Sequence, residues 1–167
     1  MARIDSVTRT SPSHSRSGRA PRRLRRWRSL PADDRALLLR AMATVVVVRV
    51  ALSLLSPRRT MRATLRLQRW YGRPGRSSSL SDERIAWAVT VASRRVPRAT
   101  CLTQALATQA LLARLGRTSA LRIGVGRDEQ GKVCAHAWVE VSGRAIIGGG
   151  GLERYTRMPD LDAVAGG

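Results

Sequence analysis

Two residues of this sequence, Cys101 and His136, are of the types that form a cysteine nucleophile and its general base. Cys101 directly follows Thr100, a residue suited to cap the start of a helix. The free N–H groups and positive dipole end of a helix start favour the thiolate, the nucleophilic form of cysteine. A histidine packed against such a cysteine supplies the base that it requires. Spacing alone also allows a second interpretation, in which Cys101 is a structural cysteine and His136 is an ordinary histidine on a polar face.

His136 lies in the middle of an alternating segment, residues 133–141, that predicts a strand. In a strand, successive side chains point to opposite faces. The face expected to meet the core carries Val133, Ala135, Ala137, Val139 and Val141. The other face carries Cys134, His136, Trp138 and Glu140. The candidate base therefore shares a face with a second cysteine, an aromatic ring and a carboxylate.

The elements that position these residues are helices in the first part of the chain and strands in the last part. The predicted helices cover residues 30–55, 58–71, 82–96 and 101–115. The predicted strands cover residues 120–125, 133–141 and 144–147, with a two-residue hairpin turn at 142–143. Helices followed by a small antiparallel sheet indicate the α+β class.

A length of 167 residues fits one domain. Residues 1–29 are rich in Ser, Thr, Pro and Arg and have no apolar period, which predicts a disordered arm. We expect residues 30–167 to form a single domain. Within it, residues 30–79 are a helical N-terminal region and residues 80–167 are the core that holds both candidate residues.

The formal net charge of +20 suggests nucleic acid as a partner at first. The charge is +7 over residues 1–35, +11 over residues 36–99 and only +2 over residues 100–167. The segment that carries Cys101 and His136 is thus nearly neutral, and we expect no nucleic-acid partner. The arginine-rich half is either a docking surface or a solvated face whose arginine content reflects overall composition.

Residues 36–55 are apolar and long enough to cross a bilayer. Arg40 and Arg49 would each cost about 2.5–3.5 kcal/mol near the bilayer centre, so a buried helix is the preferred interpretation. No stable membrane insertion is expected. The arginines of the arm are not followed by the clean apolar stretch of a twin-arginine export signal. We therefore expect a cytoplasmic protein.

The two cysteines, Cys101 and Cys134, form no CxxC motif. A reducing compartment disfavours a disulfide between them. Together with His136 they make three potential zinc ligands, and His14 lies in the predicted arm, so a structural zinc site is not expected. We predict neither a metal nor a cofactor.

Three segments together resemble the transglutaminase-like cysteine protease superfamily. They are Thr100-Cys101-Leu102 at a helix start, residues 121–125 and residues 135–141. Within that superfamily the chain resembles the B proteins of lasso-peptide biosynthesis, in the stand-alone leader-peptidase form of the microcin-processing type. The resemblance implies a transglutaminase- or papain-like core in which the cysteine-bearing helix packs on a small antiparallel sheet.

The resemblance also implies proteolysis of a ribosomally made precursor peptide at the junction of its leader and core. Cys101 would attack the carbonyl, and His136 would carry the proton to the departing amine. A separate leader-recognition protein would present the precursor. A macrolactam synthetase would then close the ring on the freed core.

Members of the superfamily usually carry an acid, commonly aspartate, on the strand after the histidine. Here the residue opposite His136 is Gly148 or Gly149, and neither has a side chain. Glu140 shares the face of His136 but stands about 13 Å along the strand. The orienting role is open between a backbone carbonyl and the following acids: Glu153, Asp160 and Asp162.

Two further functions fit part of the sequence. A transglutaminase-like acyltransferase would pass the same thioester to an amine instead of to water. A non-catalytic basic module would bind nucleic acid or an anionic membrane, with an inert cysteine and histidine.

Overall fold

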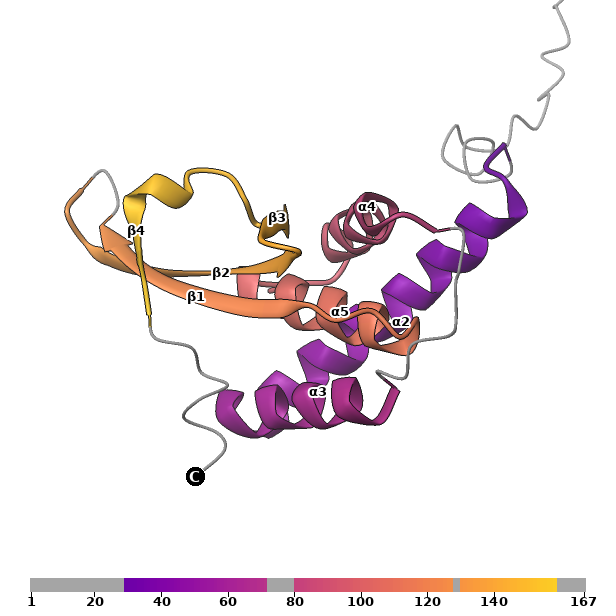
Figure 1. Ribbon diagram of the computed structural model, residues 1–167, viewed down its shortest axis with the longest axis horizontal. Coiled ribbons are helices and arrows are strands. Elements are labelled where there is room, and N and C mark those ends of the chain that lie inside the picture. The colour runs from indigo at the N-terminus through magenta and orange to yellow at the C-terminus, as the bar shows by residue number, and fades with distance from the viewer. Residues whose placement is uncertain (1–28, 72–79, 128–129, 159–167) are drawn as a thin grey trace, which may run out of the picture. The chain divides into compact units, whose positions relative to one another are not determined.

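The computed structural model describes residues 29–71, 80–127 and 130–158, and its helices lie beside a small sheet (Figure 1). The described helices are α2 (Ala32–Leu54), α3 (Pro57–Tyr71), α4 (Asp82–Ser93) and α5 (Cys101–Arg114). The described strands are β1 (Ala120–Arg127), β2 (Val133–Val141), β3 (Arg144–Ile147) and β4 (Tyr155–Arg157), with a short 3-10 helix η1 (Leu152–Arg154). The sheet is antiparallel in the order β3-β2-β1-β4. The predicted α+β class is confirmed, while the predicted arm lies outside the described residues except for Ser29.

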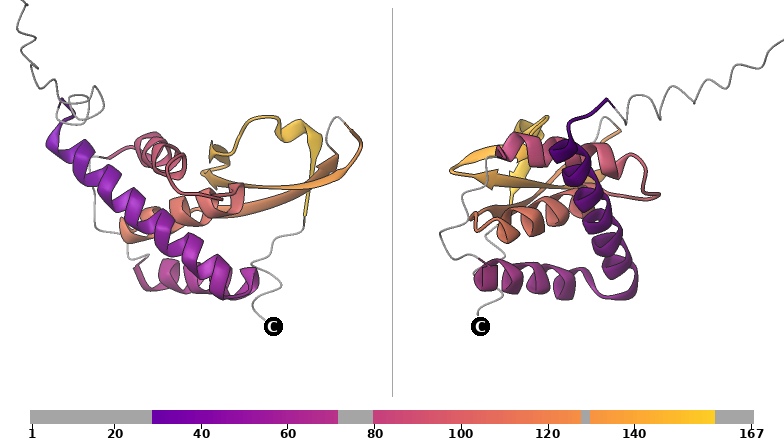
Figure 2. Two further views of the ribbon diagram at one scale, coloured as in Figure 1. Left: turned by 180° about the vertical axis from the view of Figure 1, so that it is seen from behind. Right: turned by 90° about the vertical axis from the view of Figure 1, so that its right-hand side faces the viewer.

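Helix α5 is the centre of the described fold. It contacts α2, α3 and α4 as well as strand β2. Every side chain from Ala105 to Ala113 is buried, the pattern of a helix that is covered on all sides. Figure 2 shows α5 between α3 and the sheet in the right-hand view. The residue that opens this helix is therefore held by the core rather than by a surface loop.

Helix α5 begins at the predicted cap and is capped at both ends. Thr100 is the N-cap, and its hydroxyl accepts a hydrogen bond from the backbone N–H of Thr103. The Thr103 hydroxyl in turn accepts from the backbone N–H of Thr100, which completes a capping box. Gly116 follows the helix with a φ of 72°, the left-handed conformation that favours glycine.

Helix α2 is only partly buried. One side packs inward through Leu37, Leu38, Ala41, Val45 and Val48. The other side exposes apolar residues, among them Val47 at 66% and Leu54 at 78%. The interpretation of residues 36–55 as a buried helix is thus incomplete, because one side of α2 exposes apolar residues. Among the described helices, α2 is long and apolar enough to cross a membrane.

Two ion pairs connect the helices. The buried carboxylate of Asp34 on α2 accepts hydrogen bonds from two nitrogens of Arg84 on α4. Asp82 at the start of α4 pairs with Arg117, which follows α5. Because each pair joins elements far apart in the sequence, they fix the helices around α5.

The sheet differs from the prediction in its faces and its extent. Ala137 and Val139 are buried, but Val133 is 60% exposed and Ala135 is also exposed. The outer end of the β1–β2 hairpin extends past the helices, so its apolar face meets no layer there (Figure 1). Trp138, assigned to the polar face, is 4% exposed. Strand β4 was absent from the prediction, because three residues carry too little pattern to stand out.

Replacing Asp34 with Asn should lower the free energy of unfolding by about 1–3 kcal/mol, since it removes a charged hydrogen-bond partner from a buried position. Urea denaturation measures this change. The matched variant is Glu83→Gln, which breaks the exposed pair with Arg144 and should have a much smaller effect. Equal losses in the two variants would contradict the assigned role of Asp34.

Candidate active site

Cys101 is the first residue of α5, as predicted, and its thiol is free and partly exposed. The first N–H groups of a helix have no partner within the helix. The backbone N–H of Cys101 therefore lies at the helix start next to its own side chain. An N–H group in that place can stabilise a thiolate. It can also donate to the oxyanion that forms when such a thiolate attacks a carbonyl.

His136 lies in the middle of β2, and its ring nitrogen Nε2 is 2.7 Å from the carbonyl oxygen of Gly148. A carbonyl oxygen can only accept a hydrogen bond, so Nε2 must carry the proton and donate it. In the neutral ring the lone pair is then on Nδ1. The hydrogen bond thus fixes which nitrogen of His136 is free to accept a proton.

The chain reaches this position through a tight hairpin and a register shift. Ser142 and Gly143 form the turn with φ values of 49° and 78°, and β3 pairs with β2 across an irregularity between Val139 and Glu140. Gly148 follows with a φ of 73°. A Cβ on Gly148 would lie 2.8 Å from the carbonyl oxygen of Ala137, so only glycine fits beside β2. The carbonyl that orients His136 therefore depends on the absence of a side chain.

Tyr155, the first residue of β4, covers the ring of His136. The two ring centroids are 5.0 Å apart, with planes 27° from parallel. Trp138 is two residues further along β2, and the centroid of its ring is 6.3 Å from that of His136. Nothing in the sequence pattern around Tyr155 indicated this contact.

Two glycines of β1 leave the room that Tyr155 occupies. Gly126 pairs with Cys134 on one side and with Tyr155 on the other. A Cβ on Gly124 would lie 2.9 Å from the Cβ of Tyr155, and one on Gly126 would meet the backbone of Arg154. Because Gly124 and Gly126 have no side chains, Tyr155 on β4 reaches across this face of β1 to His136 on β2.

The Tyr155 hydroxyl also links the site to the two thiols. Burial raises its pKa above the ordinary value, and Cys134 raises it further by charge repulsion and a hydrogen bond. Cys101 adds to the same rise through its charge, while Arg154 opposes it. Tyr155 thus stacks on His136 and lies within electrostatic range of Cys101. Through Tyr155, ring stacking on His136 and electrostatic interactions with both thiols are connected.

Residues 42–160 match the family model of the transglutaminase-like superfamily. The chain belongs to the transglutaminase-like superfamily. No curated protein and no solved structure gives a significant match to the chain. The matched range begins within α2 and includes Cys101, His136 and Tyr155.

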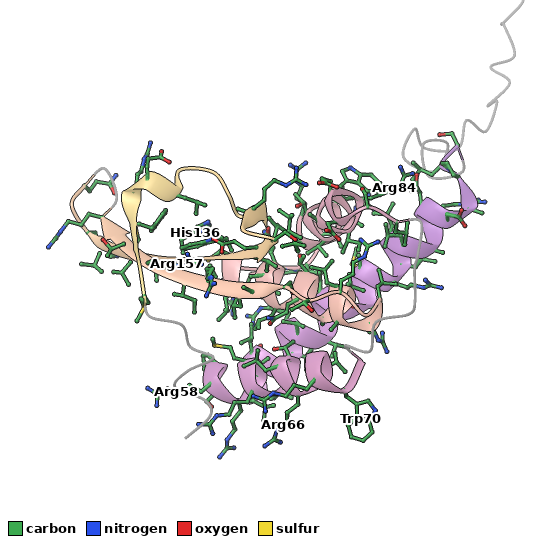
Figure 3. The ribbon with its side chains drawn as sticks, in the orientation of Figure 1. Arg58, Arg66, Trp70, Arg84, His136 and Arg157 are labelled. Carbon is green, nitrogen blue, oxygen red and sulfur yellow. The ribbon has the colours of Figure 1, made fainter. Side chains whose placement is uncertain are left out.

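In this transglutaminase-like domain, the position opposite His136 is held by a backbone carbonyl and not by an acid. Glu140 accepts hydrogen bonds from Trp138 (2.8 Å), Arg122 (3.2 Å) and Arg157 (2.7 Å), so it is engaged away from His136. Figure 3 shows Arg157 and His136 together on the sheet.

Among the described residues, no hydrogen bond or ion pair joins Glu153 to His136. Glu153 is exposed in η1, and Asp160 and Asp162 lie outside the described residues. The sequence left the partner that orients His136 open between a backbone carbonyl and an acid. In the described residues this partner is the carbonyl of Gly148. Within the same residues no group of three or more His, Cys, Asp or Glu side chains is placed to hold a metal ion.

Replacing Gly126 with Ala should displace β4 and Tyr155, because the new Cβ would overlap the Arg154 backbone. We expect a loss of about 1–3 kcal/mol in the free energy of unfolding, together with faster alkylation of Cys134. Gly150→Ala is the control, since its Cβ would have nothing within 4 Å. Unchanged stability and unchanged alkylation in the Gly126 variant would contradict the packing described for Tyr155.

Tyr155 should ionise above the ordinary tyrosine pKa of 10.0, because its site is partly buried and a negative thiolate at Cys134 disfavours a second negative charge. Ultraviolet absorbance of the phenolate against pH, in a Tyr71→Phe background, isolates this group. Adding Cys134→Ala should move the midpoint to lower pH. A midpoint that does not respond to Cys134 would show that the two groups are not in contact.

Proposed function

We propose that this protein is a cysteine peptidase that removes the leader from a ribosomally made lasso precursor peptide. The observation that carries the proposal is the hydrogen bond from His136 to Gly148, which leaves Nδ1 as the proton acceptor. Membership of the transglutaminase-like superfamily and the helix-start position of Cys101 support it.

The first half of the reaction forms a thioester. Nδ1 of His136 takes the proton of the Cys101 thiol, and the sulfur attacks the carbonyl carbon at the leader–core junction. The oxyanion that forms is stabilised by the backbone N–H of Cys101. His136 then gives its proton to the departing core amine, the C–N bond breaks, and the leader is held on Cys101.

The second half releases the leader. Nδ1 of His136 takes a proton from a water molecule, whose oxygen attacks the thioester carbon. The C–S bond breaks, the proton returns to sulfur, and the leader leaves as a carboxylic acid. Throughout the cycle the Gly148 carbonyl accepts from Nε2, so the ring keeps one orientation. No cofactor takes part in these steps.

In this proposal the peptidase works with other proteins in the cytoplasm. A separate leader-recognition protein brings the precursor, and a macrolactam synthetase uses the freed core amine. The proposal includes no nucleic-acid partner, and it is supported by the near-neutral charge of the segment around the candidate site. The proposal also includes no stable membrane insertion, and it is supported by the packing of one side of α2 against α4 and α5.

The test is cleavage of a precursor peptide encoded near this gene, in the presence of its leader-binding protein, followed by mass spectrometry. Cys101→Ala and His136→Ala should each lower the rate by about a thousandfold or more, because nucleophile and base act as a unit. Glu153→Gln should cleave like the wild type, because the orienting partner of His136 is a carbonyl. Circular dichroism checks that each variant is folded.

Full activity of Cys101→Ala would overturn the proposal. The masses of the products separate it from acyl transfer, since hydrolysis adds one water and transfer to an amine does not. Affinity for DNA, RNA or anionic vesicles with no cleavage would favour the basic binding module instead.

A further inference from the structure

A groove lies between the second half of α2 and the turn that joins α4 to α5. Its volume is ≈ 540 Å³. Val46 and Val50 of α2, which are 42% and 49% exposed, line it together with Val96 of the turn. Three arginines, Arg49, Arg95 and Arg98, also line it. An apolar concavity with a few charged groups is the usual form of a ligand site.

The charges of these three arginines are not compensated within the described part of the chain. The acids that form ion pairs there are Asp34, Asp82, Glu83 and Glu140, and each is paired with an arginine outside the groove. Arg49 donates to the hydroxyl of Ser53, which is neutral. A groove that combines apolar walls with unpaired positive charge is complementary to an occupant with apolar side chains and carboxylates.

The groove is also close to the candidate nucleophile along the chain. Arg98 precedes Cys101 by three residues, a span of at most about 11 Å. Its φ of 58° is unusual for a residue other than glycine, and the turn it belongs to leads directly into the N-cap of α5. An extended peptide seated in the groove is therefore within a few residues of the sulfur.

We propose that this groove binds an acidic segment of the peptide substrate, next to the bond that is cleaved. The inference rests on the proposed peptidase function and names the substrate chemistry that it recognises. A concave apolar groove fits side chains of a peptide better than it fits a flat bilayer. Its apolar walls distinguish it from the polar, strongly basic surfaces that bind nucleic acid.

The experiment measures binding to the full chain carrying Cys101→Ala, so that no turnover interferes. The probe is a short fluorescent peptide in which leucines alternate with glutamates, followed by fluorescence anisotropy. R95E/R98E should weaken binding by about tenfold or more, equivalent to about 1.4 kcal/mol. The matched control is R58E/R66E, which makes the same charge change on α3, where both side chains point away from the fold (Figure 3). It should change the affinity by less than about twofold.

Equal weakening by the two double variants would mean general attraction to a basic protein and would overturn the inference. Unchanged binding in R95E/R98E would overturn it as well. Vesicles of phosphatidylserine and phosphatidylcholine that bind through Arg95 and Arg98, while the peptide does not, would make the groove a lipid surface instead. If R95E/R98E does not fold, Val50→Asp places a like charge in the groove and should weaken peptide binding in the same way.

The binding experiment and the cleavage experiment can fail independently of each other. Cleavage that survives Cys101→Ala would contradict the peptidase mechanism and leave the binding measurement intact. If R95E/R98E binds the peptide normally while Cys101→Ala is inactive in cleavage, the groove is not the binding site and the peptidase mechanism still stands.

Discussion

The hydrogen bond between His136 Nε2 and the Gly148 carbonyl is the constraint on which the candidate site depends. It fixes the ring tautomer, since a carbonyl has no proton to give. Members of the superfamily usually carry an acid there, whereas the described residues of this chain provide a neutral oxygen. A neutral acceptor orients the imidazole as a carboxylate does, but it adds no negative charge to stabilise the imidazolium. In our proposal, orientation is therefore the main contribution of this partner.

Three glycines make the arrangement possible, and each acts by having no side chain. Gly148 brings its carbonyl against β2, where a Cβ would meet the Ala137 oxygen. Gly124 and Gly126 open β1 so that Tyr155 reaches His136 across it. Together they let a four-stranded sheet bring the imidazole of His136, the phenol of Tyr155 and the thiol of Cys134 together. Helix α5 supplies the other half of the candidate site from the centre of the core.

Much of this fold follows from local sequence signals. Thr100 caps α5 as predicted, Ser81 caps α4 at the start of the predicted helix, and β2 and β3 begin and end where the alternation and the hairpin turn indicate. The placement of Cys101 at a helix start and of His136 within a strand was predicted for the same reason, since both lie on elements with strong patterns. The contact of Tyr155 with His136 was not, because it depends on a three-residue strand and on empty space at two glycines. The sequence shows where the glycines are, but not which neighbouring residue occupies the space that they leave.

The solvent exposure of individual apolar residues could not be predicted from the sequence either. Val133 and Ala135 alternate as core residues do, yet no helix covers that end of the hairpin. Val46 and Val50 look like core residues of an apolar helix, yet they line an open groove beside three arginines. In both cases the tertiary arrangement, rather than the local pattern, decides which apolar side chains meet water.

The central claim is that His136 activates Cys101, and alkylation of the two cysteines by iodoacetamide tests it without any substrate. Peptide mass spectrometry follows Cys101 and Cys134 separately across neutral pH, in the wild type and in His136→Ala. The account predicts that Cys101 reacts faster than Cys134 in the wild type and loses that advantage when His136 is replaced. Equal reactivity of the two cysteines, with no response to the loss of His136, would contradict it.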